Sequence, residues 1–434
     1  MSPTEASVVL FGLFFVLLFL RVPIAFALAI ACLPSLFLEP RLSPMVMFNE
    51  TMTAFSSFLL LAIPFFLLAA NLMNAGGITD RLMLLSRALV GHLPGSLAQV
   101  NVVLSVFFGG ISGSATADAA SQGKIFIDAQ VNEGYDRSFS IAITAVSAIL
   151  AVIIPPSIIM VVWGGVLSVS VGALFIGGVL PGLLLALAMM LTVHAYAVIR
   201  KYPKYPRATW REIVRASFIS VPALMTPVII IGGKVWGWFT PTESAAIAVV
   251  YALLLSVLFY RELGWRALRE CFSDTAKLSA VTLFCVGTAS VFGWLLAFYQ
   301  IPQVLLHAAL SWNMSLWQAG FFIAGVFLVV GCFLDAIPAI IIVGTVLAPV
   351  AAAAHMHPLH FALIGIISLA FGLVTPPYGL CLMISCAIGK MRLIDTMKDV
   401  TIMLVPCLLV LVAIIMFPGV FLAPMAWADP QLFK

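Results

Sequence analysis

The sequence predicts an all-α polytopic membrane protein built from two inverted repeats, each with one re-entrant hairpin and one broken helix. Of the 434 residues, 63% are hydrophobic and only 9% are charged, whereas a soluble domain has about 25% charged residues. Apolar stretches of about 20 residues, long enough to span a bilayer, recur along the chain. Finally, two proline pairs, 155–156 and 376–377, each interrupt such a stretch.

The spacing of the proline pairs indicates a duplicated unit. Gly110 precedes Pro155 by 45 residues, and Gly331 precedes Pro376 by the same number. Proline is costly inside a helix because it lacks an N–H donor and its ring clashes with the preceding turn. Two such breaks in register are typical of secondary transporters, which place their binding sites at discontinuous helices.

The first half, residues 1–198, has the following predicted elements in order. Apolar stretches at about 4–20, 22–38, 55–73 and 173–198 predict single helices. The stretch at about 96–131 is too long for one crossing and has small and polar residues near its middle, so it predicts a re-entrant hairpin. The stretch at about 137–172 predicts a helix broken at the first proline pair.

The second half, residues 217–434, has the same kinds of element. Single helices are predicted at about 217–238, 241–260, 278–299 and 399–417, a hairpin at about 316–354 and a broken helix at about 358–388. The polar, proline-containing segment 199–216 is the predicted cytoplasmic linker. Segments 78–91, 261–277 and 389–398 mix charged and apolar residues, which predicts interfacial helices or, alternatively, ordinary cytoplasmic loops.

The basic residues predict the orientation in the membrane. Placing the arginine- and lysine-rich linker in the cytoplasm puts 18 of the 21 Lys and Arg residues on that side, leaving Arg41, Lys234 and Lys434 outside. Both termini are then periplasmic. The first hairpin enters from the cytoplasm and the second from outside, so the two repeats are inverted. The net charge of +4 therefore reflects topology and does not indicate nucleic-acid binding.

Each proline pair leaves two backbone carbonyls without their usual helical donors. These are the carbonyls of Ala151 and Val152 in the first repeat and of Gly372 and Leu373 in the second. A dehydrated alkali cation suits such oxygens. The alternative is a packing kink whose carbonyls are satisfied by serine, threonine or water.

The predicted hairpin tips carry most of the polar side chains at membrane depth. Ser112, Ser114 and Thr116 in the first tip offer groups for a carboxylate or a cation; alternatively, the small residues there serve helix packing. The second tip centres on residues 335–338 and contains Asp335. Asp118, in the first hairpin, is a second intramembrane acid and so a functional candidate.

Three other motifs have simpler interpretations. Glu243 follows Thr240 and Thr242 at the start of a helix, which predicts a capping role. The three histidines of the 355–360 HxHxxH group have no nearby acid or cysteine, so a metal is not expected. The sequence Gly110–Gly113 matches a GxSG protease motif, but its only candidate partner, His194, lies near a cytoplasmic helix end. The seven scattered cysteines indicate no disulfide framework.

Four blocks, FFGGISGSATADAA, VIIPPSIIMVVWG, FTPTESAAIAV and GLVTPPYGLCLMI, resemble the large membrane subunit of tripartite ATP-independent periplasmic (TRAP) transporters. The resemblance implies a sodium-driven elevator-type importer of organic acid anions such as sialic acid or C4-dicarboxylates in the bacterial inner membrane. It also implies two partners, a small four-helix membrane subunit and a soluble periplasmic binding protein, and no cofactor besides Na⁺. A stand-alone sodium/anion symporter is the alternative.

The resemblance also implies ligand sets. The first sodium site would use Gly109, Ser112, Ala151, Ile154 and Pro156, and the second Gly331, Gly372, Thr375 and Tyr378. Family members often have a serine-like residue at the position of Gly109. Because glycine has no side chain, Gly109 could act as a ligand only through its backbone. The substrate would lie between the hairpin tips, near Ser114, Thr116 and Asp335.

Overall fold

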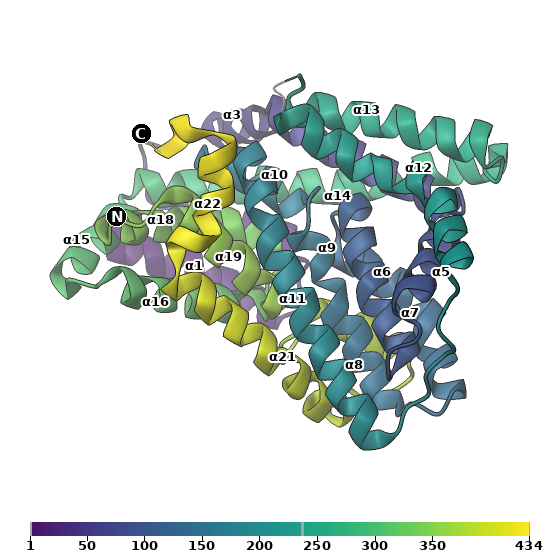
Figure 1. Cartoon of the computed structure of the whole chain (residues 1–434). Coiled ribbons are helices and arrows are strands. Elements are labelled where there is room, and N and C mark those ends of the chain that lie inside the picture. Colours follow the sequence, from purple (N-terminus) through teal and green to yellow (C-terminus); the bar gives the residue numbers. More distant parts are fainter. Residues whose placement is uncertain (1, 236–237, 434) are drawn as a thin grey trace.

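The computed structural model describes residues 2–235 and 238–433, and all regular structure in this part of the chain is helical (Figure 1). Seven of the described helices are long and apolar enough to span a membrane, or eight if one bent pair counts as a span. The predicted all-α polytopic class is therefore confirmed. Lys434 and the side chain of Lys234, both predicted to be external, lie outside what the structure describes.

The first half contains eleven labelled helices in the described residues. They are α1 (Pro3–Phe19), α2 (Ile24–Leu38), α3 (Pro44–Phe55), α4 (Ala62–Ala75, preceded by a 3-10 turn at Phe58–Leu61), α5 (Ile78–Val90), α6 (Ser96–Ser112), α7 (Ala115–Asn132), α8 (Arg137–Ala148), α9 (Leu150–Ile153), α10 (Ile158–Leu167) and α11 (Val171–Arg200).

The second half has the remaining labelled helices. They are α12 (Trp210–Val235), α13 (Pro241–Leu254, extended by a π-helical stretch at Leu255–Phe259), α14 (Trp265–Phe298), α15 (Ile301–Trp312), α16 (Leu316–Gly331), α17 (Ala336–Ala339, extended by a π-helical stretch at Ile340–Gly344), α18 (Thr345–Ala353), α19 (Pro358–Gly372), α20 (Leu380–Ile388), α21 (Leu393–Met416) and α22 (Pro418–Ala428), followed by a 3-10 turn at Pro430–Phe433.

Some predicted boundaries are wrong. Segment 261–277 is not a separate interfacial helix or a loop, because α14 continues without a break from Trp265 through the apolar stretch. Likewise α21 begins at Leu393, within the predicted segment 389–398. No proline interrupts either junction, so the charged turn extends the apolar helix. Segment 78–91 does form a short helix of its own, α5. The sequence did not predict α3, α15 or α22.

Each half pairs a hairpin with a broken helix. In the first, α6 and α7 form the hairpin and α6 packs against α8 and α9; in the second, α16 packs against α19. The first broken helix bends by 45° between Ile153 and Ile158. In the second, the break is longer and runs from residue 373 to 379. Both proline–proline peptide bonds are cis.

The helices form two crossing groups. In Figure 1, α12 and α13 run side by side across the top of the molecule, while α8, α11 and α21 run steeply below them. Both ends of the chain lie on the same side in this view. The start of α8 and the end of α11 lie beside a network in which Asp136 accepts hydrogen bonds from Tyr202 and Arg200.

A buried tryptophan joins the two halves. Trp163 of α10 is fully buried and packs against Phe327 of α16 and Phe361 of α19, with ring centroids 5.5 and 5.2 Å away. Gly365 makes room for the indole, since a Cβ there would lie 2.2 Å from its Cη2. Aromatic pairs of this kind add about 0.5–1.5 kcal/mol each beyond their burial, so the two repeats are held together at this point.

Candidate functional site

Both hairpin tips and both helix breaks line one cavity of about 460 Å³. On the opposite wall lie residues of α4 and α14. The walls are largely apolar, and polar side chains gather at the tips and at one point on each wall helix. The polar lining residues are Asn71, Ser112, Ser114, Thr116, Thr282 and Asp335.

The first tip is a tight turn between α6 and α7. Gly113 has a φ of +63°, a left-handed conformation that glycine adopts without strain. A Cβ at this position would also lie 2.8 Å from the carbonyl oxygen of Pro156, so the tip touches the first helix break. Ser114 caps α7 by accepting from the N–H of Ala117, and its hydroxyl lies 3.2 Å from that of Thr116.

The second tip brings a carboxylate to the cavity. Asp335 is the N-cap of α17, and its Oδ1 accepts a hydrogen bond of 2.8 Å from the N–H of Ala336. Asp335, Ala336 and Ile337 all line the cavity. Asp335 thus caps α17 as Ser114 caps α7, with a carboxylate in place of a hydroxyl.

Three helices begin at the cavity. Ser114, Ser157 and Asp335 are the N-caps of α7, α10 and α17, and the first turns of all three helices line the cavity. Helix N-termini carry partial positive charge and free N–H groups, which favour an anion. No Lys, Arg or His is among the described lining residues, and Asp335 is the one acid. An organic anion bound here would need a counter-cation to offset that carboxylate.

The structure brings three residues of the first predicted sodium set, Gly109, Ala151 and Ile154, into contact. A Cβ on Gly109 would lie 3.0 Å from the Leu150 carbonyl oxygen, 3.1 Å from Ile154 Cβ and 3.3 Å from Ala151 Cα, so the hairpin and the break are in backbone contact. Ser112 ends α6 at the cavity. The C-terminal ends of α6 and α9 thus lie close together. Such helix ends carry carbonyl groups with partial negative charge, which favour cations.

The second predicted sodium set is brought together in part. A Cβ on Gly372 would lie 2.5 Å from both the Cα and the carbonyl carbon of Gly331, so the two backbones touch. The hydroxyl of Thr375 donates to the Phe371 carbonyl over 2.7 Å. The side chain of Tyr378, in contrast, is half-exposed and packs against Phe333, away from the cavity. Only its backbone could serve a site here.

Protein donors meet three of the four carbonyls that the prolines free. Val152 accepts from the Ser157 hydroxyl over 2.6 Å, Gly372 from the Thr375 N–H over 3.1 Å, and Leu373 from the Cys381 N–H over 2.9 Å. Among the described residues, none donates to the fourth, Ala151. A kink whose carbonyls are satisfied by protein donors therefore accounts for three of the four carbonyls, and one of these donors is a serine hydroxyl.

Other predicted candidates lie outside the cavity. Asp118 is fully buried within the first hairpin, where its Oδ1 accepts from Gln122 over 2.6 Å. Glu243 is a helix cap as predicted, and its partner is Thr240: Glu243 Oε2 accepts from the Thr240 N–H over 2.7 Å. No histidine lines the described cavity beside Ser112, so the protease motif has no partner base there.

The 355–360 histidines do not form a metal centre in the described part of the chain. His360 Nε2 lies 2.9 Å from the Ile414 carbonyl oxygen, and His357 caps α19.

Sequence reasoning missed the wall of the cavity opposite the tips. Asn71 of α4 donates to Thr275 of α14 over 2.8 Å, and both Asn71 and Thr282 line the cavity. Asn71 is a polar residue in an otherwise apolar stretch, a signal that would have singled it out. Thr282 has no such signal, because threonine is common in membrane helices.

Comparison with known proteins identifies relatives along nearly the whole chain. The family described as "Tripartite ATP-independent periplasmic transporter, DctM component" matches residues 11–420. A sialic acid TRAP transporter large permease protein, SiaM of Vibrio cholerae, is 35% identical over 402 residues, which cover 93% of this chain and 94% of the relative. A C4-dicarboxylate TRAP transporter large permease protein, DctM of Pseudomonas aeruginosa, is 35% identical over 368 residues, covering 85% and 86%.

A solved structure shares the fold. The Alcanivorax borkumensis YdaH transporter, whose topology is described as unusual, aligns with a TM-score of 0.59 over 87% of this chain and 88% of the other. Since the two sequences are only 12% identical, this likeness concerns the fold alone.

Proposed function

This chain belongs to the DctM component family of TRAP transporters and is a large permease subunit, not an enzyme, and we propose that it couples sodium entry to the import of an organic acid anion. The observation that carries the proposal is the convergence of three helix N-termini on a cavity that contains a carboxylate and no basic side chain. The N-termini suit the acid groups of the substrate. The lone carboxylate makes a co-bound cation favourable.

Sodium would bind where each hairpin meets its broken helix. In both halves glycine backbones allow contact at this junction, Gly109 with α9 and Gly331 with Gly372. Hard oxygen ligands suit alkali cations, and helix C-terminal ends supply carbonyl oxygens with partial negative charge. The proposed ligand sets are Gly109, Ser112, Ala151, Ile154 and Pro156 for one ion and Gly331, Gly372, Thr375 and Tyr378 for the other, with Tyr378 acting through its backbone.

The substrate would lie between the tips, near Ser114, Thr116 and Asp335. Relatives with dicarboxylate and sialic acid names support an organic acid. Uptake in proteoliposomes tests this placement: Thr116→Val and Asp335→Asn should each reduce uptake at least about tenfold, the effect expected from leaving a buried polar partner unpaired. Thr401→Val and Asp274→Asn, at exposed positions, serve as matched controls. Equal effects of the two pairs would overturn the placement.

We further propose an elevator motion of the hairpins and broken helices against a scaffold containing α4 and α14. The cavity lies between these two groups, which such a motion requires. A thiol cross-link between Ala70→Cys on α4 and Ala117→Cys on α7, which line the cavity from opposite groups, should stop uptake, and cleavage of the link should restore it. Undiminished uptake in the linked protein would refute the sliding motion.

The tripartite family implies two further components. We propose that these are a small four-helix membrane subunit and a soluble periplasmic binding protein, in the bacterial inner membrane with both chain termini periplasmic. The stand-alone symporter remains the competing proposal. Uptake by the chain without either component would favour that competitor.

A further inference from the structure

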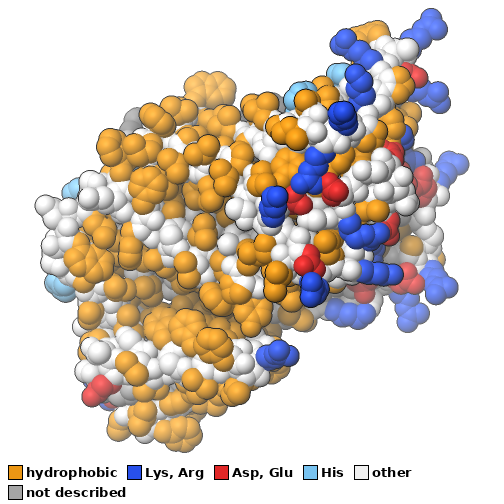
Figure 2. Space-filling model, turned by 90° about the horizontal axis from the view of Figure 1, so that it is seen from below, with side chains coloured by type: hydrophobic (Ala, Val, Ile, Leu, Met, Phe, Trp, Pro, Cys, Tyr) orange, Lys and Arg blue, Asp and Glu red, His pale blue; other side chains and the backbone are white. Residues whose placement is uncertain are grey.

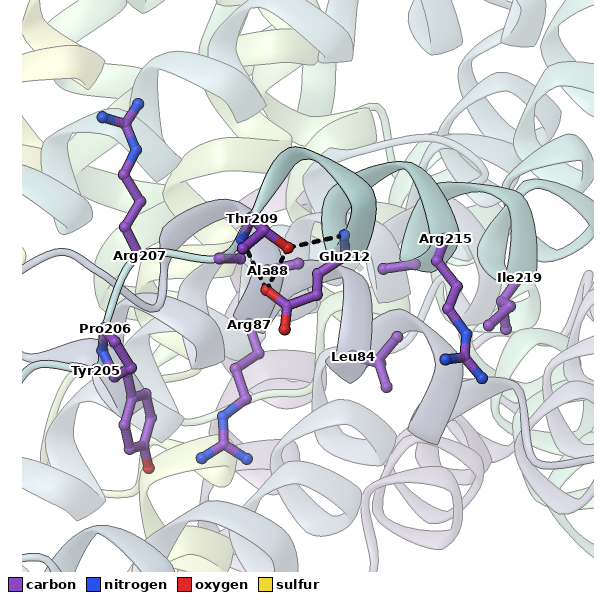
Figure 3. Close-up of a pocket in the computed structure, with 12 residues that line it drawn as sticks. Leu84, Arg87, Ala88, Tyr205, Pro206, Arg207, Thr209, Glu212, Arg215 and Ile219 are labelled. Carbon is purple, nitrogen blue, oxygen red and sulfur yellow. Dashed lines mark hydrogen bonds between the residues drawn. The ribbon is translucent and has the colours of Figure 1, made fainter.

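A second pocket, of about 670 Å³, lies between α5, α12 and the irregular segment 201–209 that joins the two halves (Figure 3). It shares no lining residue with the cavity described above. Figure 2 shows that most of the basic and acidic side chains visible on one face gather at one end, whereas hydrophobic side chains cover much of the rest of that face. Arg207 and Arg215 belong to the basic stretch of residues 200–215, and Arg87 comes from α5.

The pocket has unpaired positive charge. Arg87, Arg207 and Arg215 line it, and none of them forms a salt bridge with a described residue. The one acid in the lining, Glu212, is held by a cap: its Oε2 accepts from the N–H and the hydroxyl of Thr209, over 2.7 and 2.9 Å. In Figure 3, Arg87 and Arg215 extend toward the same side of the pocket, with Leu84 between them, whereas Arg207 extends away.

Hydrogen bonds and stacking fix the pocket walls. The Arg87 guanidinium lies over the Tyr205 ring, 4.2 Å from its centroid. The Tyr205 N–H donates to the Gly91 carbonyl over 3.0 Å, and the Pro203 carbonyl accepts from the N–H of Gly95 over 3.2 Å. The segment 201–209 is thereby tied to the end of α5 and to the base of the first hairpin, so the pocket is built in advance of any ligand.

The rim of the pocket is apolar. Leu84 and Ile219 line it and are 50% and 37% exposed, and nearby on α12 Phe218 is 76% exposed. In a membrane protein such exposed side chains face acyl chains at negligible cost. A ligand that has a phosphate at one end and hydrocarbon at the other matches both parts of the pocket, whereas free phosphate matches only the arginines.

We propose that this pocket binds the headgroup phosphate of an anionic phospholipid, with Arg87 and Arg215 as the phosphate-binding residues. Arginine suits a phosphate because its planar guanidinium donates two parallel hydrogen bonds. Basic pockets at the membrane surface attract anionic headgroups in the same way. The acyl chains would pass over Leu84 and Ile219. A lipid bound here would clamp α5, the segment 201–209 and α12 together.

Native mass spectrometry of the purified full chain, titrated with phosphatidylglycerol or phosphatidylcholine of the same acyl chains, tests the proposal. Phosphatidylglycerol should bind more tightly. Arg87→Gln and Arg215→Gln should each weaken its binding about fivefold, the contribution expected from one basic residue at an anionic surface. Arg211→Gln, on the same helix but outside the pocket lining, should change it less than about twofold.

Three results would overturn the proposal. An equal loss in Arg211→Gln would show that general surface charge holds the lipid. Displacement by millimolar inorganic phosphate would assign the pocket to a free anion. Loss of bound lipid when the chain is purified within its complete complex would assign the pocket to a protein partner.

Discussion

Replacing Gly372 with alanine tests the contact on which the second proposed sodium site depends. The new Cβ would lie 2.5 Å from two backbone atoms of Gly331, whereas carbon atoms pack at about 3.5 Å or more. The hairpin and the broken helix must therefore separate by about 1 Å. Backbone atoms cannot rotate away, so we expect the upper part of the usual overpacking cost, about 3 kcal/mol. Alanine regains up to about 1 kcal/mol in helix propensity, which leaves a net cost of about 2 kcal/mol.

If that cost falls on the sodium-bound state, sodium affinity decreases about 30-fold. The assay is uptake by proteoliposomes as a function of sodium concentration, with thermal unfolding in detergent to measure folding separately. Gly325→Ala is the matched control, because Gly325 lies on the same helix as Gly331 and a Cβ there meets nothing within 4 Å. An unchanged sodium response in Gly372→Ala, equal to that of the control, would refute the packing argument.

Three further predictions concern individual hydrogen bonds. Thr375→Val, which removes a 2.7 Å bond, should raise the half-saturating sodium concentration about 2- to 10-fold with little change in expression. Ser157→Ala leaves the Val152 carbonyl without its 2.6 Å donor, so unfolding should become easier by about 1–3 kcal/mol. Because the Tyr202 hydroxyl holds the pKa of Asp136 below its usual range, stability should fall with pH below about 4, and Asp136→Asn should lose this dependence.

The threonine and serine predictions each have a control with similar chemistry. Thr401 makes the same bond to the carbonyl four residues back, over 2.8 Å at an exposed site, so Thr401→Val should leave sodium dependence unchanged. Ser7→Ala removes a 2.8 Å serine bond far from the breaks and should have a smaller effect on unfolding than Ser157→Ala.

For the pH prediction, the sign follows from the depressed pKa. The stabilisation is complete above the unfolded carboxyl pKa and is lost as pH falls through the folded one. An acid loss in Asp136→Asn as steep as in the wild type, or steeper, would contradict this prediction. Equal sodium responses of the two threonine variants would contradict the Thr375 prediction, and equal stabilities of the two serine variants would contradict the Ser157 prediction.

The lengths of the apolar stretches and the positions of the proline pairs predicted most of the fold. Apolar length located the spanning helices, and the proline pairs located both breaks, since proline acts through local backbone chemistry alone. The charged segments were harder. Residues 265–277 form the first part of α14, because a helix tolerates charged first turns where no proline or cap interrupts it. Local composition does not distinguish such an extension from a separate surface helix.

The site was predictable on one side only. Ser114, Thr116 and Asp335 stood out as polar residues at helix interruptions, and the structure places all three on one cavity. The position of Thr282 on the cavity wall and the direction of the Tyr378 side chain depend on how helices distant in sequence pack together. A single sequence does not show which helices pack together. The donor from Ser157 to Val152 is local in sequence, yet only the bent geometry of the break brings the two atoms together.

Sodium-gradient uptake by proteoliposomes tests the central claim most directly, with a panel of organic acids and with the binding protein and small subunit present or omitted. We predict that an organic acid accumulates only with an inward sodium gradient and all three components. Accumulation that is equal with potassium in place of sodium would contradict the proposed coupling at the two hairpin and break junctions.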